Sequence, residues 1–416
     1  GLPFPEQMTY EEWANSSFPA QGTECQTCHM TSTSGFACTD LWPLRDDLPQ
    51  HELTGANTFM SGVLKNLYGT SLNRVANFDR TINLALDNLQ NHSADLWLGV
   101  PARAEAGDPV PVRVRVTNRT GHKLPTGYPE GRRMWLHVKV EDGIGTTLFE
   151  TGAYDAATAT LAVDPFLKVY ETKHGIHGEG EGFHLVRNDR VFKDNRIPPA
   201  GFRPTPLTAP VGAVFPVQPD GSLANWDVSE FEVATTPAVY GPLTVTASLY
   251  YQTASREYIE FLRDENVSGP DPHDPDSLAA NRGEKMWNYW NDYGKSAPVL
   301  METRVKTIPL NRPLPTAAVA PDPVVPRIVS LGDNPFRDRT EITFQVPAAA
   351  AVRLEIFEVT GRRVRTLVSG ARAPGEHRVA WDGRTESGAG AATGSYFVRL
   401  DVPGHSPLVK RLLILR

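Results

Sequence analysis

The sequence predicts a mainly β protein with a small α-helical segment near its N-terminus and two immunoglobulin-like β-sandwich domains. Three observations lead to this fold class. Apolar and polar residues alternate in short runs along residues 98–308 and again along 327–416, which is typical of half-buried strands. The 34 glycines and 35 prolines punctuate these runs and argue against a helical bundle. Helical spacing of apolar residues is found mainly between Thr58 and Leu98.

Residues 1–97 form the predicted helical segment, which also contains irregular stretches. Apolar residues at helical spacing predict one helix around Val63, Leu67 and Leu72. A second helix is expected around Ile82, Leu84, Leu86 and Leu89. Asn77 or Asp79 would cap the N-terminus of this second helix, because their side chains accept hydrogen bonds from exposed backbone amides.

Residues 98–308 form the first predicted sandwich, with long insertions and one helix near Arg256–Arg263. Its clearest strands follow Pro109, Met134 and Leu243, where apolar residues occupy every second position. Residues 309–326 contain six prolines, which favour an extended spacer, so they are expected to form a linker. Residues 327–416 carry about seven short alternating segments, enough for a small immunoglobulin-like domain.

Composition excludes several classes of protein. The chain carries 41 Lys and Arg against 48 Asp and Glu, a net charge of -7, which argues against a general nucleic-acid binder. It contains no run of 18 apolar residues, so no transmembrane segment is expected. Its three cysteines lie within 14 residues of one another, which is not the pattern of a disulfide framework. They indicate one local chemical site near the N-terminus.

The motif Cys25-Gln-Thr-Cys28-His29 is the strongest functional signal. This spacing is the attachment sequence for haem c. Two thiols at positions i and i+3 can add to the two vinyl groups of one porphyrin, and the adjoining imidazole can bind its iron. The sequence therefore predicts haem c as the cofactor, with Cys25 and Cys28 as attachment residues and His29 as a ligand to the iron.

Two other chemistries remain open for these cysteines. Cys25, Cys28, Cys38 and His51 could form a Cys₃His zinc site. A thioredoxin-like redox pair would need a βαβ setting, which this proline-rich segment lacks. If haem is bound, no role can be assigned to Cys38.

The second axial position of the haem iron needs its own ligand if the protein transfers electrons. His51 is the first candidate, because it follows His29 by enough chain to loop over a porphyrin. His92, His122 and Met60 are alternatives. His122, in the loop Gly121-His-Lys-Leu-Pro-Thr-Gly, could instead bind a haem on another segment.

Residues 9–305 resemble bacterial multihaem c-type cytochromes. Thr9–Ser16 with Gly22–Met30 is similar to their closing haem-binding segment, and His51–Asn57 to the segment that supplies a distal histidine. Four runs are similar to the β-domain that follows the haems: Asn118–Gly127, Arg132–Leu136, Asp194–Phe202 and Tyr250–Ser255. The family usually carries further haem motifs upstream, whereas this chain contains a single one. We therefore expect other haems on a missing upstream segment or on a partner chain.

The C-terminal region resembles two related families of domain. Asn334–Phe344, Val359–Arg365, Gly375–Arg384 and Gly394–Leu400 are similar to the immunoglobulin-like domain of flagellar hook-capping proteins. They are equally similar to the C-terminal sorting domains of type IX secretion substrates. Both resemblances imply a bacterial protein that acts in the periplasm or at the cell surface. Residues 327–416 carry a net charge of +5 against -12 for the remainder, which would suit an acidic partner.

The sequence leaves three functions open. The first is an extracytoplasmic cytochrome that carries electrons through a bis-histidine haem, and the second is a multihaem oxidoreductase acting on a small nitrogen or sulfur compound. The third is a surface structural protein, as a homo-oligomer or filament, in which the haem is incidental. Electron transfer is favoured over enzymatic catalysis, because no catalytic residues can be named. His174, His177 and His184 are expected in a flexible loop, and Asp264–Asp276 in an acidic loop that could bind calcium.

Overall fold

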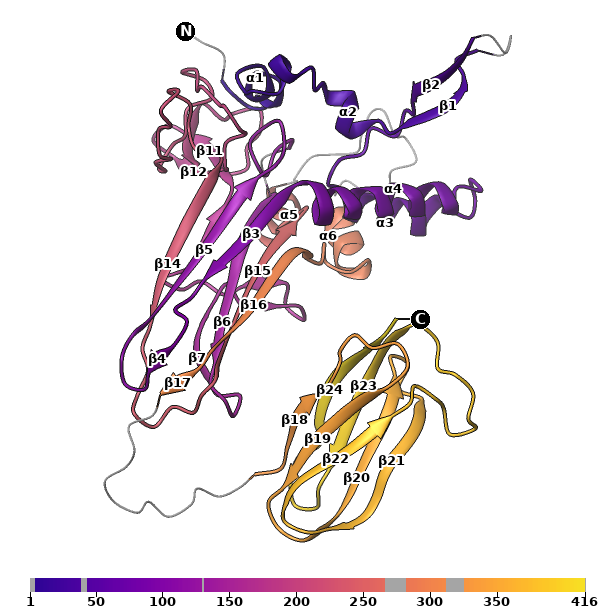
Figure 1. Cartoon of the computed structure of the whole chain (residues 1–416). Helices are drawn as coiled ribbons and strands as arrows, with labels where there is room; N and C mark the ends of the chain where they lie inside the picture. Colours follow the sequence, from indigo (N-terminus) through magenta and orange to yellow (C-terminus); the bar gives the residue numbers. More distant parts are fainter. Residues whose placement is uncertain (1–3, 39–42, 129–130, 266–281, 312–324, 416) are drawn as a thin grey trace. The chain divides into compact units, whose positions relative to one another are not determined.

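The computed structural model describes residues 4–38, 43–128, 131–265, 282–311 and 325–415 (Figure 1). Strands hold 40% of the residues and helices 17%, which confirms the predicted mainly β class. The chain divides into two compact units, residues 1–313 and 314–416. Most of the predicted linker 309–326 lies outside the described residues.

Short helices and one β-hairpin make up the N-terminal part of the first unit. The helices are α1 (Thr9–Ala14), α2 (Cys25–His29), α3 (Thr58–Tyr68) and α4 (Val75–Asp87), with short helical turns η1 (Pro19–Gln21) and η2 (Asn88–His92). Strands β1 (Ser32–Phe36) and β2 (Leu44–Pro49) pair antiparallel in a hairpin that the apolar pattern did not predict. Helices α3 and α4 form the expected helical pair (Figure 1), although Leu72 lies beyond the end of α3 and Leu89 lies in η2.

The predicted cap of the second helix is wrong. Helix α4 begins at Val75, so Asn77 and Asp79 lie inside it. Asp79 instead pairs with Lys65 of α3 and joins the two helices. The cap in this region belongs to α3, where the Asn57 side chain accepts a hydrogen bond from the Met60 amide at 2.9 Å.

Two antiparallel sheets form the sandwich of the first unit. One sheet has the order β14-β5-β3, with β14 at Trp226–Val233, β5 at Val110–Asn118 and β3 at Ala94–Gly99. The other has the order β10-β6-β15-β16, with β7 also paired to β6. Its strands are β6 (Arg133–Glu141), β7 (Thr147–Thr151), β10 (Val169–Tyr170), β15 (Leu243–Gln252) and β16 (Val299–Ile308).

The alternation seen in the sequence becomes the core of this sandwich. Val110, Val112, Val114 and Val116 of β5 are all buried, and the residues between them face outward. The valines join Leu136 of β6 and Leu249 of β15 in one apolar cluster. Burial of one face of each sheet fixes the register of the strands, because a slip by one residue would expose the whole apolar set.

Insertions between the sandwich strands form several smaller elements of the unit. Strands β11 (Thr172–Ile176), β12 (Gly180–Glu181) and β13 (Arg190–Asp194) form a small sheet. Helix α5 (Arg256–Glu265) confirms the helix predicted there, while α6 (Arg282–Asp292), which packs on it, was not predicted. Short pairs join β4 (Ala104–Glu105) to β17 (Leu310–Asn311) and β8 (Tyr154–Asp155) to β9 (Thr160–Leu161). Most of the acidic loop lies outside the described residues.

The second unit is a smaller sandwich with its own core. One sheet has the order β18-β19-β22 and the other β21-β20-β23-β24. The strands are β18 (Arg327–Leu331), β19 (Thr340–Val346), β20 (Ala350–Glu358), β21 (Arg363–Arg372), β22 (Gly375–Trp381), β23 (Gly394–Asp401) and β24 (Leu408–Ile414). Trp381 is fully buried and contacts Phe336 and Tyr396 edge to face.

Truncation of the first core should destabilise the protein strongly. Leu249→Ala removes a fully buried side chain of β15, so the free energy of unfolding should fall by about 2–5 kcal/mol. Val305→Ala on the neighbouring β16 alters a side chain that is 58% exposed and should change it by less than about 0.5 kcal/mol. Urea unfolding measures both variants, and equal losses would contradict the assigned register.

Candidate cofactor site

Helix α2 is a single turn that carries the three residues of the predicted motif. Glu24 precedes it and forms a capping box with Thr27, which stabilises the first turn. Cys25 and Cys28 stand three residues apart, so the helix presents both thiols on one side. Both are free and exposed. Although the residue is exposed as a whole, partial burial of the Cys28 thiol raises its pKa, and the neighbouring Cys25 raises it further.

His29 ends this helix and is fixed by Thr54. The His29 Nδ1 atom donates a hydrogen bond to the carbonyl oxygen of Thr54, and the Thr54 amide donates to the His29 carbonyl at 2.9 Å. Thr54 itself is buried. With Nδ1 engaged by a carbonyl, Nε2 is the ring nitrogen left to bind a metal, which is the usual arrangement of metal-bound histidines.

His122 lies in the loop that follows β5 and is held in a similar way. Its Nδ1 atom is 3.1 Å from the Lys123 carbonyl and 3.3 Å from the Thr120 hydroxyl. The buried Asn118 side chain shapes the loop, because it donates to the carbonyls of His122 and Ile197 at 2.7 and 2.9 Å. The His122 ring therefore also keeps Nε2 available.

The imidazole rings of His29 and His122 lie close together and nearly parallel. Their ring centroids are 6.2 Å apart and their planes differ by 19°. An imidazole nitrogen binds a transition metal in the plane of its ring at about 2 Å, so a centroid separation of 6.2 Å is of the size needed for one ion between the two Nε2 atoms. Burial lowers the pKa of His122, and the lowering by His29 adds to it, although Lys123 and Glu12 oppose the shift. His122 is therefore neutral at pH 7, the form that binds metals.

A cavity of about 500 Å³ adjoins the motif and both histidines. That size is typical of cofactor sites. Its aromatic and aliphatic walls come from Tyr10, Trp13, Phe18, Ala56, Leu89, Leu124 and Pro125, and its polar lining includes Cys25, Cys28, His29, His92, His122, Arg119 and Arg132. The N-terminal helices and the sandwich of the first unit with its insertions, here called the β-domain, thus both contribute walls to one mainly apolar cavity.

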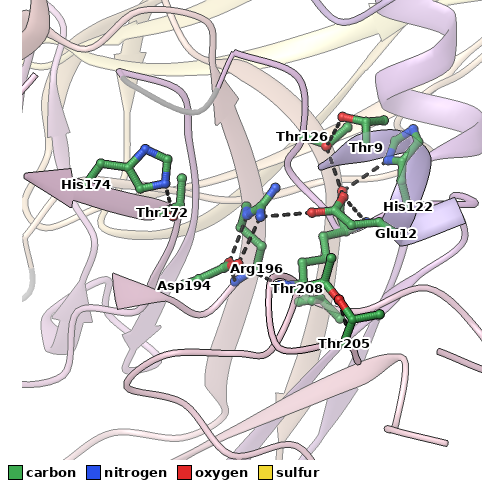
Figure 2. Close-up of polar contacts among 12 residues, drawn as sticks. Thr9, Glu12, His122, Thr126, Thr172, His174, Asp194, Arg196, Thr205 and Thr208 are labelled. Atoms are coloured by element: carbon green, nitrogen blue, oxygen red, sulfur yellow. Dashed lines mark hydrogen bonds and ion pairs between the residues drawn. The ribbon is translucent and has the colours of Figure 1, made fainter. Parts of the chain in front are cut away.

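A buried ion network fastens the helical wall to the β-domain (Figure 2). Glu12 of α1 is fully buried and pairs with Arg196 at 2.9 Å. It also accepts hydrogen bonds from the Lys123 amide at 3.1 Å and the Thr126 hydroxyl at 3.2 Å. Asp194 completes the network through Arg196 at 2.8 Å and the Lys123 ammonium at 2.6 Å. Two carboxylates therefore balance two cations beneath the His122 loop.

The charges of this network depend on one another. Burial raises the pKa of Asp194, but Arg196 and Lys123 outweigh it and bring the pKa to about 2. Burial lowers the pKa of Arg196, but Asp194 and Glu12 raise it further than burial lowers it. Lys123 keeps a lowered pKa, because burial outweighs the attraction of Asp194.

The structure brings together only some of the residues predicted from the sequence. Cys25, Cys28, His29 and His122 line one cavity. His51 is exposed and does not line that cavity, and Met60 packs against a separate apolar cluster. His92 lines the cavity, but its Nε2 atom lies 3.3 Å from the Asp87 carboxylate.

His174, His177 and His184 do not line this cavity, and the residues of the alternative zinc site do not form a metal-binding group. His174 is buried and lies 3.6 Å from Glu6, so its assignment to a flexible solvated loop is wrong. His177 contacts Arg190 at 3.1 Å, and His184 packs against Phe261. Across the described ranges, which include Cys38 and His51, no three His, Cys, Asp or Glu side chains are grouped closely enough to hold a metal ion. This finding does not favour zinc.

Sequence reasoning missed the ion network altogether. Glu12, Lys123, Asp194 and Arg196 come from three distant stretches of the chain. Lys123 and Arg196 each neighbour apolar or proline residues, a weak sign of burial that only the tertiary contacts resolve.

Comparisons with known proteins support the C-terminal resemblance. Residues 332–402 match the FlgD Ig-like domain. FlgD from Xanthomonas campestris is similar to this chain, with 24% identity over 21% of this chain and 64% of that one, and a TM-score of 0.17. PorZ, a surface component of the type IX secretion system of Porphyromonas gingivalis, has 23% identity over 21% of this chain and 11% of that one, with a TM-score of 0.17.

A penta-haem cytochrome c552 from Thermochromatium tepidum is also similar in structure. It has 17% identity over 73% of this chain and a TM-score of 0.38. This chain spans about half of its length, 51%. No curated protein matches the chain. Among the described residues, none of the helices has the length and apolar character needed to cross a membrane.

Neutralising Asp194 should weaken the protein and change how its stability depends on pH. The pKa of this carboxyl is depressed in the folded state, so its contribution is present above about pH 4 and is lost as the pH falls towards 2. Asp194→Asn leaves Arg196 and Lys123 without this carboxylate, and we expect a loss of about 3–5 kcal/mol at pH 7. The slope of stability between pH 4 and 2 should also become shallower.

Urea unfolding at pH 7, 4 and 2.5 measures these effects. The matched control is Glu230→Gln, which breaks an ion pair with Arg113 in which both side chains are more than 60% exposed. It should cost less than about 1 kcal/mol. A wild-type pH slope in Asp194→Asn would refute the assigned role of this carboxylate.

Proposed function

We propose that the first unit is part of an extracytoplasmic c-type cytochrome that carries electrons through a single bis-histidine haem c. One observation carries the proposal. The imidazole that follows the Cys25/Cys28 pair lies 6.2 Å from a second imidazole, His122, measured between ring centroids, and both rings line the same apolar cavity. A haem-attachment sequence alone would not require that second ring.

The residues of the cavity fit the chemistry of a porphyrin. Cys25 and Cys28 would form the thioether bonds, and Tyr10, Trp13 and Phe18 supply aromatic surface for a flat apolar ring. The carbonyls of Thr54 and Lys123 fix the two imidazoles through Nδ1 and leave Nε2 of each ring for the iron. When bound, haem c supplies one-electron oxidation and reduction at its iron.

His122 therefore replaces His51 as the distal ligand in this proposal. The sequence favoured His51 because it is near His29 along the chain. The cavity instead meets a loop of the β-domain, whose position is set by Asn118 and by the ion network below it. Two neutral imidazoles favour a lower reduction potential than a histidine and a methionine do.

This arrangement favours electron transfer over the alternative of an oxidoreductase enzyme. Catalysis at a haem iron needs an open axial position for the substrate. A histidine on each side would occupy both positions. The hydrogen bonds from the two Nδ1 atoms to backbone carbonyls would orient these ligands, and no residue near them has been assigned as a proton donor for catalysis. Other haem-bearing chains or segments remain the expected electron partners.

The second unit suits a role in docking or assembly. Its match to the FlgD Ig-like domain covers most of the sandwich, and flagellar hook capping takes place outside the cytoplasm. Haem c in a bacterium is consistent with the same location, periplasmic or at the cell surface. The surplus of arginine on this unit would suit an acidic partner surface.

Substitution of His122 tests the proposed distal ligand. The wild-type protein should show the visible spectrum of low-spin, six-coordinate haem. His122→Ala should convert it to a high-spin spectrum, because one axial ligand is lost. His122→Met should remain six-coordinate with a higher reduction potential, since a methionine ligand raises it.

The matched control is His51→Ala, which should keep the wild-type spectrum. Peptide mass analysis supplies the second readout, since the fragment that contains Cys25 and Cys28 should carry one haem. A spectrum that changes in His51→Ala and not in His122→Ala would contradict the assignment of the ligand. A fragment without haem would overturn the proposed function itself.

A further inference from the structure

Arg132 lines the proposed haem cavity and is held there by the backbone. Its Nη1 atom donates a hydrogen bond to the Thr126 carbonyl at 2.8 Å. Gly127 makes room for this contact, because a Cβ atom at that position would overlap the guanidinium. Tyr251 lines the same cavity; burial raises the pKa of its hydroxyl, and the positive charge of Arg132 opposes that shift.

Among the residues that the structure describes, Arg132 has no acidic partner, unlike the neighbouring cations. Lys123 and Arg196 share Asp194, Arg133 lies 3.3 Å from Glu257, and Arg119 lies 3.3 Å from Asp95. Within the described part of the chain, no carboxylate comes within ion-pair distance of Arg132. A half-buried guanidinium beside an apolar cavity is stabilised by an anion that accepts its remaining hydrogen bonds.

Haem c brings such an anion with it. The two propionate groups of a porphyrin lie on the half of the ring away from the vinyl groups that react with cysteines. In this cavity the cysteines belong to α2 in the helical wall, whereas Arg132 belongs to the β-domain wall and immediately precedes β6. We propose that Arg132 binds a haem propionate. This inference rests on the proposed function of the cavity and adds the residue that orients the ring within it.

The planar fork of arginine explains why this residue type suits the position. A guanidinium can donate two parallel hydrogen bonds to one carboxylate, whereas a lysine offers a single charged point. The bond from Nη1 to the Thr126 carbonyl fixes the plane of the fork and leaves its other N–H groups for the ligand. Pairing with the propionate would also place a positive charge beside the haem.

The first test is the reduction potential of the purified, haem-loaded protein. Arg132→Gln should lower the potential, because loss of a nearby positive charge favours the oxidised haem, which carries one more positive charge. Arg132→Lys should lie between this variant and the wild type. The control is Arg115→Gln, which removes an exposed guanidinium that does not line the cavity and has no carboxylate partner among the described residues. It should leave the potential unchanged.

The second test addresses the propionate directly. In protein with Cys25→Ala and Cys28→Ala, added haem binds without covalent attachment, and its dissociation constant can be compared with that of haem dimethyl ester. With Arg132 present, esterification should weaken binding about tenfold or more, as expected for a lost hydrogen bond to a charged group. With Arg132→Gln, both forms should bind about equally.

The outcomes separate this inference from the proposed function. Haem found on the motif, with a reduction potential and an ester effect that are insensitive to Arg132, would overturn the role of Arg132 and leave the cytochrome proposal intact. Absence of haem from the motif, together with failure of the Cys25→Ala and Cys28→Ala protein to bind added haem, would overturn both. An ester effect that disappears only in Arg132→Gln would support the pairing.

Discussion

The buried pairing of Glu12 with Arg196 is the constraint on which the cavity depends. It joins α1, which carries Tyr10 and Trp13, to the β-domain, which carries His122. Removing charges from water is costly, and the cost is met here only because each carboxylate has several donors and each cation has a carboxylate. Loss of any one member would leave an uncompensated charge beneath the site, so wall, loop and ligand are fixed together.

The site is consequently assembled from two parts of the chain that are stabilised differently. His29 sits on one helical turn, whose position depends on a reciprocal pair of hydrogen bonds with Thr54. His122 sits on a loop that leaves a long, strongly alternating strand and is shaped by Asn118. A single turn has little stability of its own in water. The contacts with Thr54 therefore hold this short helix in position.

The sequence allowed much of the fold to be predicted and about half of the site. Alternation in β5 and spacing in α4 are local patterns, so they identified strands and helices directly. The cysteine motif is equally local. Nearness along the chain favoured His51 as a partner of His29, whereas the packing of the β-domain brings the His122 ring to 6.2 Å from the His29 ring. The charged network and the hairpin β1–β2 depend on contacts between distant residues, which no local pattern records.

The short parallel pairing of β4 with β17 has a mechanical consequence. It joins Leu310 and Asn311, near the end of the first unit, to Ala104 and Glu105 near the start of its sandwich. The long ladder between β16 and β15 follows immediately inward from it. A pulling force applied through the C-terminal unit would therefore act first on the β4–β17 pair. It would then act on the hydrogen bonds between β15 and β16. Force that enters at Leu310 and Asn311 would therefore load the strands at the end opposite the cavity, whose lining includes His122 and Tyr251.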